Sequence, residues 1–216
     1  MNYDDEEILT VGGSELNENN EWVASKKFAS FSLFNEQWSD GPQLNRARTE
    51  PAGCCMSSKL YVFGGIKDQN EKTLETSIEI LVINSEQEWW QLLDEPLMEM
   101  FGSCACQLTA NEMIIVGGAK FDATNKQYAC SDVLVFDIEQ RKTEKVITSN
   151  ELTMSANGSI VMASEGKTLT GWVDEFNKKA LVVSITKDGE NYSIQHIETH
   201  SYSASSEDEE EKADQP

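Results

Sequence analysis

The sequence feature that most constrains the fold is a short aliphatic run that ends in two glycines and recurs along the chain. It occurs as Ile8 to Gly13, Leu60 to Gly65 and Met113 to Gly118. The second glycines are residues 13, 65 and 118, and a further step of 53 residues reaches Gly171, where Thr170 replaces the first glycine. The repeat glycines are Gly12, Gly13, Gly64, Gly65, Gly117, Gly118 and Gly171. A spacing this regular predicts tandem structural repeats.

Other short apolar segments lie before and after the glycine-ending runs. A segment of small residues precedes it in three units, at 52–56, 102–106 and 158–162. Aliphatic segments follow at 28–34, 78–83, 133–138 and 180–185, and last elements at 37–38, 89–92, 144–147 and 192–194. The segments are short and rich in Val, Ile, Leu and Phe, which favours strands over helices. The pattern predicts four strands per unit, with the small-residue strand innermost.

Four antiparallel strands repeated about every 50 residues are typical of a β-propeller blade. The pattern resembles the kelch repeat, whose signature carries an arginine before the first strand, Gly-Gly after the second and a tryptophan on the fourth. In the second unit, Arg48, Gly64-Gly65 and Trp89 or Trp90 match this signature. The resemblance implies an all-β, kelch-type propeller of about four four-stranded blades.

The resemblance extends over most of the chain and suggests how it is divided. We expect an acidic N-terminal segment at 1–7, a propeller at 8–200 with blades at about 8–44, 45–97, 98–150 and 151–200, and an acidic tail at 201–216. Seven residues precede Ile8, so the first unit is expected to lack its first strand. The tail has too few apolar residues to offset chain entropy and is predicted to be disordered.

The number of units bears on ring closure, because kelch propellers generally have more blades than this chain supplies. The resemblance leaves open a four-bladed ring, a half-ring completed by a second copy or a partner, and a shortened relative of a longer propeller. We favour an incomplete or open ring, because uncovered sheet faces and strand edges invite association with another chain.

The charge balance narrows the class of partner. The chain has 17 Lys and Arg against 38 Asp and Glu, a net charge of −21, and no basic run. Such a surface repels phosphate backbones, so nucleic-acid binding is disfavoured. No apolar stretch is long enough to span a bilayer, and the acidic N-terminus does not resemble a targeting signal. An intracellular, cytoplasmic location is expected, with the five cysteines as free thiols.

The sequence shows no catalytic apparatus. Phosphate-loop, nucleophile-elbow and zinc-protease motifs are missing. His196 and His200 lie near the C-terminal edge, where extended structure is expected, and Cys104 and Cys106 have the wrong spacing for a zinc knuckle. We therefore predict a protein that is not an enzyme, with no cofactor and no metal site. The alternative is a propeller enzyme that binds a metal or a small molecule.

The remaining function is binding through loops. In kelch-like propellers the loop after the second strand and the loop joining successive blades open on one face, where partners commonly bind. The resemblance therefore points to Arg46, Arg48, Lys67, Asp68, Lys120, Phe121, Trp172 and Glu175 as partner-binding residues. Trp22 and Trp172 are candidate anchors, although Trp172 could equally fold back on its own blade. The predicted function is a protein interaction module or scaffold for a partner that the sequence does not specify.

Overall fold

The fold consists of small antiparallel sheets. The computed structural model of the chain describes residues 2–4, 7–83, 89–93, 98–130, 132–148, 168–173, 179–188 and 191–201. All regular elements in these ranges are strands, which confirms the all-β prediction. Within the same ranges, no helix is long and apolar enough to cross a membrane. The predicted strand at 158–162, the end of the second blade at 94–97 and the tail from 202 onward lie outside the described residues.

The first sheet has four strands in the order β1-β2-β5-β6. Their bounds are Asn2–Asp4 for β1, Glu7–Val11 for β2, Phe28–Ser32 for β5 and Gln37–Asp40 for β6. The prediction that the first unit lacks its first strand is therefore wrong. The acidic residues at the N-terminus hid a strand of only three residues, whose register is irregular where it pairs with β2.

The second and third sheets repeat this order. The second is β12-β11-β8-β7 and the third is β13-β14-β17-β18. Their bounds are Ala52–Met56 for β7, Lys59–Phe63 for β8, Ile78–Val82 for β11, Gln91–Leu93 for β12, Cys104–Gln107 for β13, Glu112–Val116 for β14, Asp132–Asp137 for β17 and Lys142–Thr148 for β18. As predicted, the strand of small residues lies at one edge of each sheet, beside the glycine-ending strand.

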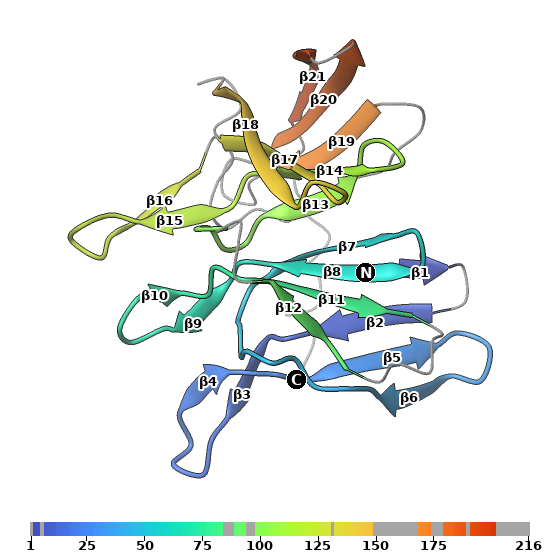
Figure 1. The fold of residues 1–216 in the computed structure, drawn as a ribbon. Helices are drawn as coiled ribbons and strands as arrows, with labels where there is room; N and C mark the ends of the chain where they lie inside the picture. Colours follow the sequence, from blue (N-terminus) through green and yellow to red (C-terminus); the bar gives the residue numbers. More distant parts are fainter. Residues whose placement is uncertain are drawn as a thin grey trace, which may run out of the picture.

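The fourth sheet has three described strands, in the order β19-β20-β21. They are Thr168–Val173, Lys179–Asp188 and Asn191–Ser201. The four sheets follow one another through the molecule, with the first and the fourth at opposite ends (Figure 1). The described strands of the fourth sheet do not pack against those of the first, so the arrangement is an open propeller.

Apolar clusters between neighbouring sheets hold the arrangement together. Between the first two sheets, Leu9 and Leu44 pack against Leu60, Leu81 and Trp90. A larger cluster joins the second and third sheets and includes Tyr61, Phe63, Met98, Met113 and Phe136. Because each cluster uses residues of both sheets, neither sheet can bury its face without its neighbour.

The segments after the glycine pairs are β-ribbons and not the polar loops that the sequence suggested. Three two-stranded ribbons form: β3–β4 (Ser14–Leu16 and Trp22–Ala24), β9–β10 (Ile66–Asp68 and Thr73–Leu74) and β15–β16 (Ala119–Phe121 and Gln127–Ala129). All three extend from the same side of the molecule (Figure 1), and we call this side the ribbon face.

A recurring side-chain turn shapes the ribbon ends. The Oδ1 atoms of Asn17, Asp68 and Asp122 each accept hydrogen bonds from backbone N–H groups two to four residues later. This arrangement is an Asx turn, which lets a short side chain replace a backbone acceptor. Asn and Asp at these positions therefore set where each ribbon reverses.

Candidate partner-binding surface

The first two glycine pairs dock on the linker that enters the next sheet. The N–H of Gly65 donates to the carbonyl of Met100 at 2.9 Å, and that of Gly13 donates to the carbonyl of Arg48 at 2.9 Å. Gly65 has φ +108°, and a Cβ at that position would lie 2.8 Å from the carbonyl oxygen of Thr49. Glycine is required here both for its backbone conformation and for the close approach of another backbone. The glycines thus place the ribbons directly over the linkers between sheets.

Arg48 lies inside this junction and cannot bind a partner, which corrects the sequence-based assignment. Its side chain is 0% exposed, as is that of Glu79, and Nη2 lies 2.8 Å from Glu79 Oε1. Nη1 donates to the carbonyl oxygens of Gly64 and Ser77 at 3.0 and 2.9 Å. The arginine of the repeat signature therefore ties the linker to the end of the glycine strand. Its role is structural.

Backbone groups of the linker complete this buried ion pair. Glu79 accepts hydrogen bonds from the N–H groups of Asn45 and Arg46 at 2.7 and 3.0 Å. Burial lowers the pKa of Arg48, while the charge of Glu79 and the hydrogen bond to it act in the opposite direction. Burial would raise the pKa of the adjacent Glu75, but hydrogen bonds from Ser77 and the nearby arginines hold it below its ordinary value. The lowered pKa keeps the Glu75 carboxylate ionised near neutral pH, beside the buried pair of Arg48 and Glu79.

A groove of about 210 Å³ lies between the ribbons of the second and third sheets. Its lining residues are Glu50, Ile66, Gln69, Lys72, Phe101, Phe121 and Gln127. Phe121 of β15 stacks on Phe101, with ring centroids 4.9 Å apart. Lys72 Nζ lies 5.6 Å from the centroid of the Phe121 ring, within the range of a cation–π interaction. The groove therefore combines residues of two successive units.

The groove carries both charges beside its aromatic floor. Partial burial raises the pKa of Glu50, whose backbone has φ +53°. Lys72 also has positive φ, +57°, where the ribbon reverses. A groove with an acid, a base, two amides and two rings can hold a large side chain and hydrogen-bond to its polar end.

The structure separates the other predicted binding residues. Lys67 is exposed on β9, whereas the Asp68 carboxylate accepts hydrogen bonds from Asn70 and Glu71 in its own turn. Lys120 and Phe121 point to opposite faces of the ribbon, because neighbouring residues on a strand alternate. Lys120 pairs with Asp132 at 3.1 Å and lies away from the groove. Of the predicted residues whose side chains the structure describes, Phe121 alone lines the groove.

Asp132 is the centre of a small ion-pair network on the third sheet. Its carboxylate lies 2.6 Å from the Nζ of Lys145 as well as 3.1 Å from that of Lys120. Burial would raise its pKa, but hydrogen bonds from the two lysines hold the pKa of Asp132 below its ordinary value. Lys120 therefore positions the ribbon against its own sheet.

The fourth unit departs from the pattern. Gly171 pairs with Leu181 inside β19, so the strand continues through the glycine and does not end there. Trp172 follows Gly171 on β19 and pairs with Ala180 of β20, so it is not in a loop. Glu175 lies outside the described residues. His196 and His200 are on β21, which confirms the extended structure expected there.

The ribbon of the first sheet adds exposed apolar side chains to the ribbon face. Leu16 and Trp22 are cross-strand partners, and both are more than half exposed. Val23 follows on the same strand and is also exposed. The ribbon face therefore presents large apolar residues in two units, on β3–β4 and around Phe121.

Sequence reasoning missed Glu50, Gln69, Lys72, Phe101 and Gln127 as groove residues. They lie in linkers and ribbons that the sequence pattern predicted to be loops. The recurrence of Asn or Asp at 17, 68 and 122 was the available signal, because an Asx turn between short β-prone segments predicts a hairpin.

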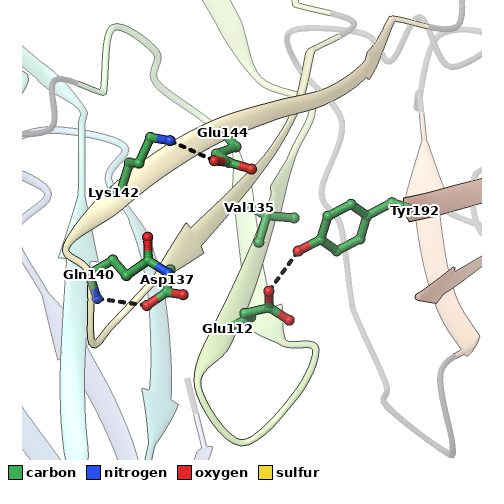
Figure 2. Close-up of a pocket in the computed structure, with 7 residues that line it drawn as sticks. All are labelled: Glu112, Val135, Asp137, Gln140, Lys142, Glu144 and Tyr192. Carbon is green, nitrogen blue, oxygen red and sulfur yellow. Dashed lines mark hydrogen bonds and ion pairs between the residues drawn. The ribbon is translucent and has the colours of Figure 1, made fainter. Parts of the chain in front are cut away.

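A second cavity, of about 470 Å³, lies where the third sheet meets β21 (Figure 2). Six polar residues and Val135 line it: Glu112, Asp137, Gln140, Lys142, Glu144 and Tyr192. The Tyr192 hydroxyl donates to Glu112 at 2.6 Å, and Lys142 pairs with Glu144 at 2.7 Å (Figure 2). Small-molecule sites are mostly apolar with a few polar groups. The charged groups here are instead engaged in an ion pair and in hydrogen bonds within the protein.

The described residues contain no group of three His, Cys, Asp or Glu side chains that could hold a metal ion. The five cysteines are free, as predicted. Burial raises the pKa of Cys54 and of Cys106 to about 12, and that of Cys55 to about 11. Thiols with such pKa values are protonated near neutral pH and are poor nucleophiles or metal ligands.

This protonation state leads to a measurable expectation. In the folded protein near neutral pH, Cys54 and Cys106 should react with a thiol reagent at least about 100-fold more slowly than after unfolding, because the thiolate is scarce and the sulfur is buried. Time-resolved alkylation followed by peptide mass spectrometry would measure this. Equal labelling rates before and after unfolding would contradict the buried placement of these strands.

Comparison with known proteins agrees with the repeat pattern and the fold. No family model matches the chain. It is 28% identical over 95 residues to a putative F-box/kelch-repeat protein of Arabidopsis thaliana, and 24% identical over 131 residues to another F-box/kelch-repeat protein of that plant. These matches cover 44% and 56% of the chain. The solved structure of YjhT superposes with a TM-score of 0.65 at 14% sequence identity, over 88% of this chain.

The repeat pattern, the fold and these relatives define a kelch-type β-propeller. In sequence pattern and fold, the chain is similar to the kelch-repeat proteins. The matched segments span 24% and 33% of the two Arabidopsis proteins, and the superposed part spans 66% of YjhT. The chain thus corresponds to part of each of these relatives.

Proposed function

We propose that the chain is a non-enzymatic interaction module that binds a partner protein through the ribbon face, with the groove between the second and third units as its anchor site. The observation that carries this proposal is the convergence of Phe121, Phe101 and Lys72 from two successive units. Aromatic side chains beside a cation are typical of the centres of protein interfaces.

The size of the groove supports a protein partner over a small molecule. Its volume of about 210 Å³ is below the roughly 300–1,000 Å³ of small-molecule pockets. It suits one large side chain of a partner, and the apolar pair Leu16 and Trp22 widens the available contact surface. The names of the two Arabidopsis relatives, both F-box/kelch-repeat proteins, are compatible with this role.

The test is affinity capture from cells that express the protein, followed by quantitative mass spectrometry. Partners captured by the wild type should fall at least about tenfold with Lys72→Glu and with Phe121→Ala, because each removes part of the groove. Lys59→Glu is the matched control. It makes the same charge reversal at the start of β8, at the opposite end of that strand from Gly64.

Each variant should keep its thermal unfolding midpoint near that of the wild type. If the two groove variants capture the same partners as Lys59→Glu at the same levels, the groove is not the anchor site. If purified protein contains stoichiometric copper or zinc, the non-enzymatic assignment is wrong.

A further inference from the structure

The same row of side chains crosses each of the first three sheets. In the first sheet the cross-strand partners are Ile8, Phe31 and Trp38. In the second, Leu60 pairs with Leu81, and Trp90 comes directly before Gln91, the partner of Ile80. In the third the partners are Met113, Phe136 and Thr143. We call these three sets the cross-sheet rows.

In the second and third sheets the cross-sheet row is buried against the preceding sheet. Trp90 is 3% exposed, its indole N–H donates to the carbonyl of Pro42 at 2.7 Å, and its ring meets Phe28 edge-on with centroids 5.5 Å apart. In the third sheet, Phe136 packs on Tyr61 and Phe63. The cross-sheet row therefore lies on the face of each sheet that packs against the preceding sheet.

In the first sheet the equivalent row is open. Trp38 is 59% exposed and Phe31 is half-buried, although the two rings pack at 5.1 Å. Leu33 and Phe34, in the turn between β5 and β6, are also exposed, Phe34 by 91%. No described residue covers Trp38 as the first sheet covers Trp90. Exposed apolar side chains gathered in this way indicate an interaction surface, which we call the first-sheet patch.

The fold itself shows what kind of surface fits a cross-sheet row. Leu9 and Phe28 of the first sheet, with Leu44 of the following linker, cover the row of the second. Tyr61 and Phe63 of the second sheet, with Met98 of the next linker, cover the row of the third. The first and second sheets thus each have a row on one face and a covering surface on the other. By analogy, the first-sheet patch should fit the covering surface of another sheet of the same repeat. In the described structure, the sheet with no successor is the fourth.

We propose that the first-sheet patch docks the fourth sheet of a second copy of this chain. Head-to-tail contacts of this type form a closed ring when the rotation between the copies allows it. Two copies would contribute eight sheets, which is within the usual four to eight blades of a propeller. Each copy would then cover the Trp38 of the other.

The charge distribution supports this orientation. Residues 1–44 contain nine acidic residues and two lysines, a net of −7. Residues 151–200 contain seven acidic residues and four lysines, a net of −3. Contact between two first sheets would bring the two most repulsive surfaces together, whereas contact between a first and a fourth sheet lowers this repulsion.

Light scattering coupled to size-exclusion chromatography of the 216-residue chain tests the proposal. The wild type should have twice the 24.2 kDa chain mass, in a concentration-dependent equilibrium with the monomer. Trp38→Glu should weaken the dimer by about 30-fold or more, because it places a charge at the centre of the contact. Trp89→Glu is the matched control, since Trp89 is 62% exposed and lies outside the cross-sheet row.

The outcomes separate clearly. A wild-type chain that stays monomeric at every concentration, a mass above two copies, or a dimer that Trp38→Glu leaves intact would each overturn the proposal. Equal loss of the dimer in Trp38→Glu and Trp89→Glu would also overturn it. If Trp38→Glu does not fold, as judged by circular dichroism, Phe34→Glu replaces it, because Phe34 is almost fully exposed and tolerates a charge in the monomer. The ribbon-face variants Lys72→Glu and Phe121→Ala should remain dimeric, which distinguishes this contact from partner binding.

Discussion

Replacing the buried Arg48 with methionine is expected to lower the free energy of unfolding by about 3–5 kcal/mol. Methionine fills much of the space of the side chain but leaves Glu79 as a buried charge without its cation. The carbonyls of Gly64 and Ser77 also lose their hydrogen-bond donor. With total stabilities of about 5–15 kcal/mol for typical domains, such a loss is a substantial fraction of the whole.

Urea unfolding at one fixed protein concentration measures this effect. Arg46→Ala is the control, because its guanidinium is 4.0 Å from Glu75 and half exposed, and pairs of this kind contribute about 0–1 kcal/mol. Its backbone N–H, which donates to Glu79, is unchanged. An Arg48→Met variant no less stable than Arg46→Ala would show that the buried ion pair does not hold the linker.

The second large effect is expected at Gly65. Gly65→Ala should cost about 2–5 kcal/mol, the sum of a strained positive φ and a clash between the new Cβ and the Thr49 carbonyl. Gly13 is the matched site in the first unit. It has a similar φ of +97°, but a Cβ there would meet no atom within 4 Å. Gly13→Ala should therefore cost only the conformational part, about 1–2 kcal/mol.

Thermal and urea unfolding of the two alanine variants separates these contributions. The difference between them reports the close approach of the two backbones, since the conformational strain is common to both. Equal destabilisation by Gly65→Ala and Gly13→Ala would mean that the linker moves away from residue 65 at little cost. The glycine pair would then be required for its turn alone.

The sequence predicted the sheets because their strands are marked by composition at a regular interval. Small residues at Ala52–Met56 and an apolar run at Lys59–Phe63 suffice to place two strands, and the glycine pair fixes where the second one ends. The ribbons have strands of two or three residues, which is too short for an alternating pattern to stand out. β1 was missed for the same reason.

Arg48 was assigned to the partner-binding face because the resemblance places the loop joining successive blades there. The contrary signal was Glu79, a carboxylate inside the apolar strand Ile78–Val82, which requires a buried partner. The groove could not be predicted in the same way. The contact of Lys72 with Phe121 joins two ribbons far apart in sequence, and it follows from the packing of whole sheets.

The docking of the first two glycine pairs on the following linkers also has an evolutionary consequence. The hydrogen bonds from Gly13 and Gly65 reach the segment that enters the next sheet and go no further. Each unit is thus fastened to its immediate neighbour through the same few backbone contacts. A gene duplication or deletion of one complete unit would preserve every junction, so the number of sheets in such a chain can change in single steps while the fold of each sheet is kept.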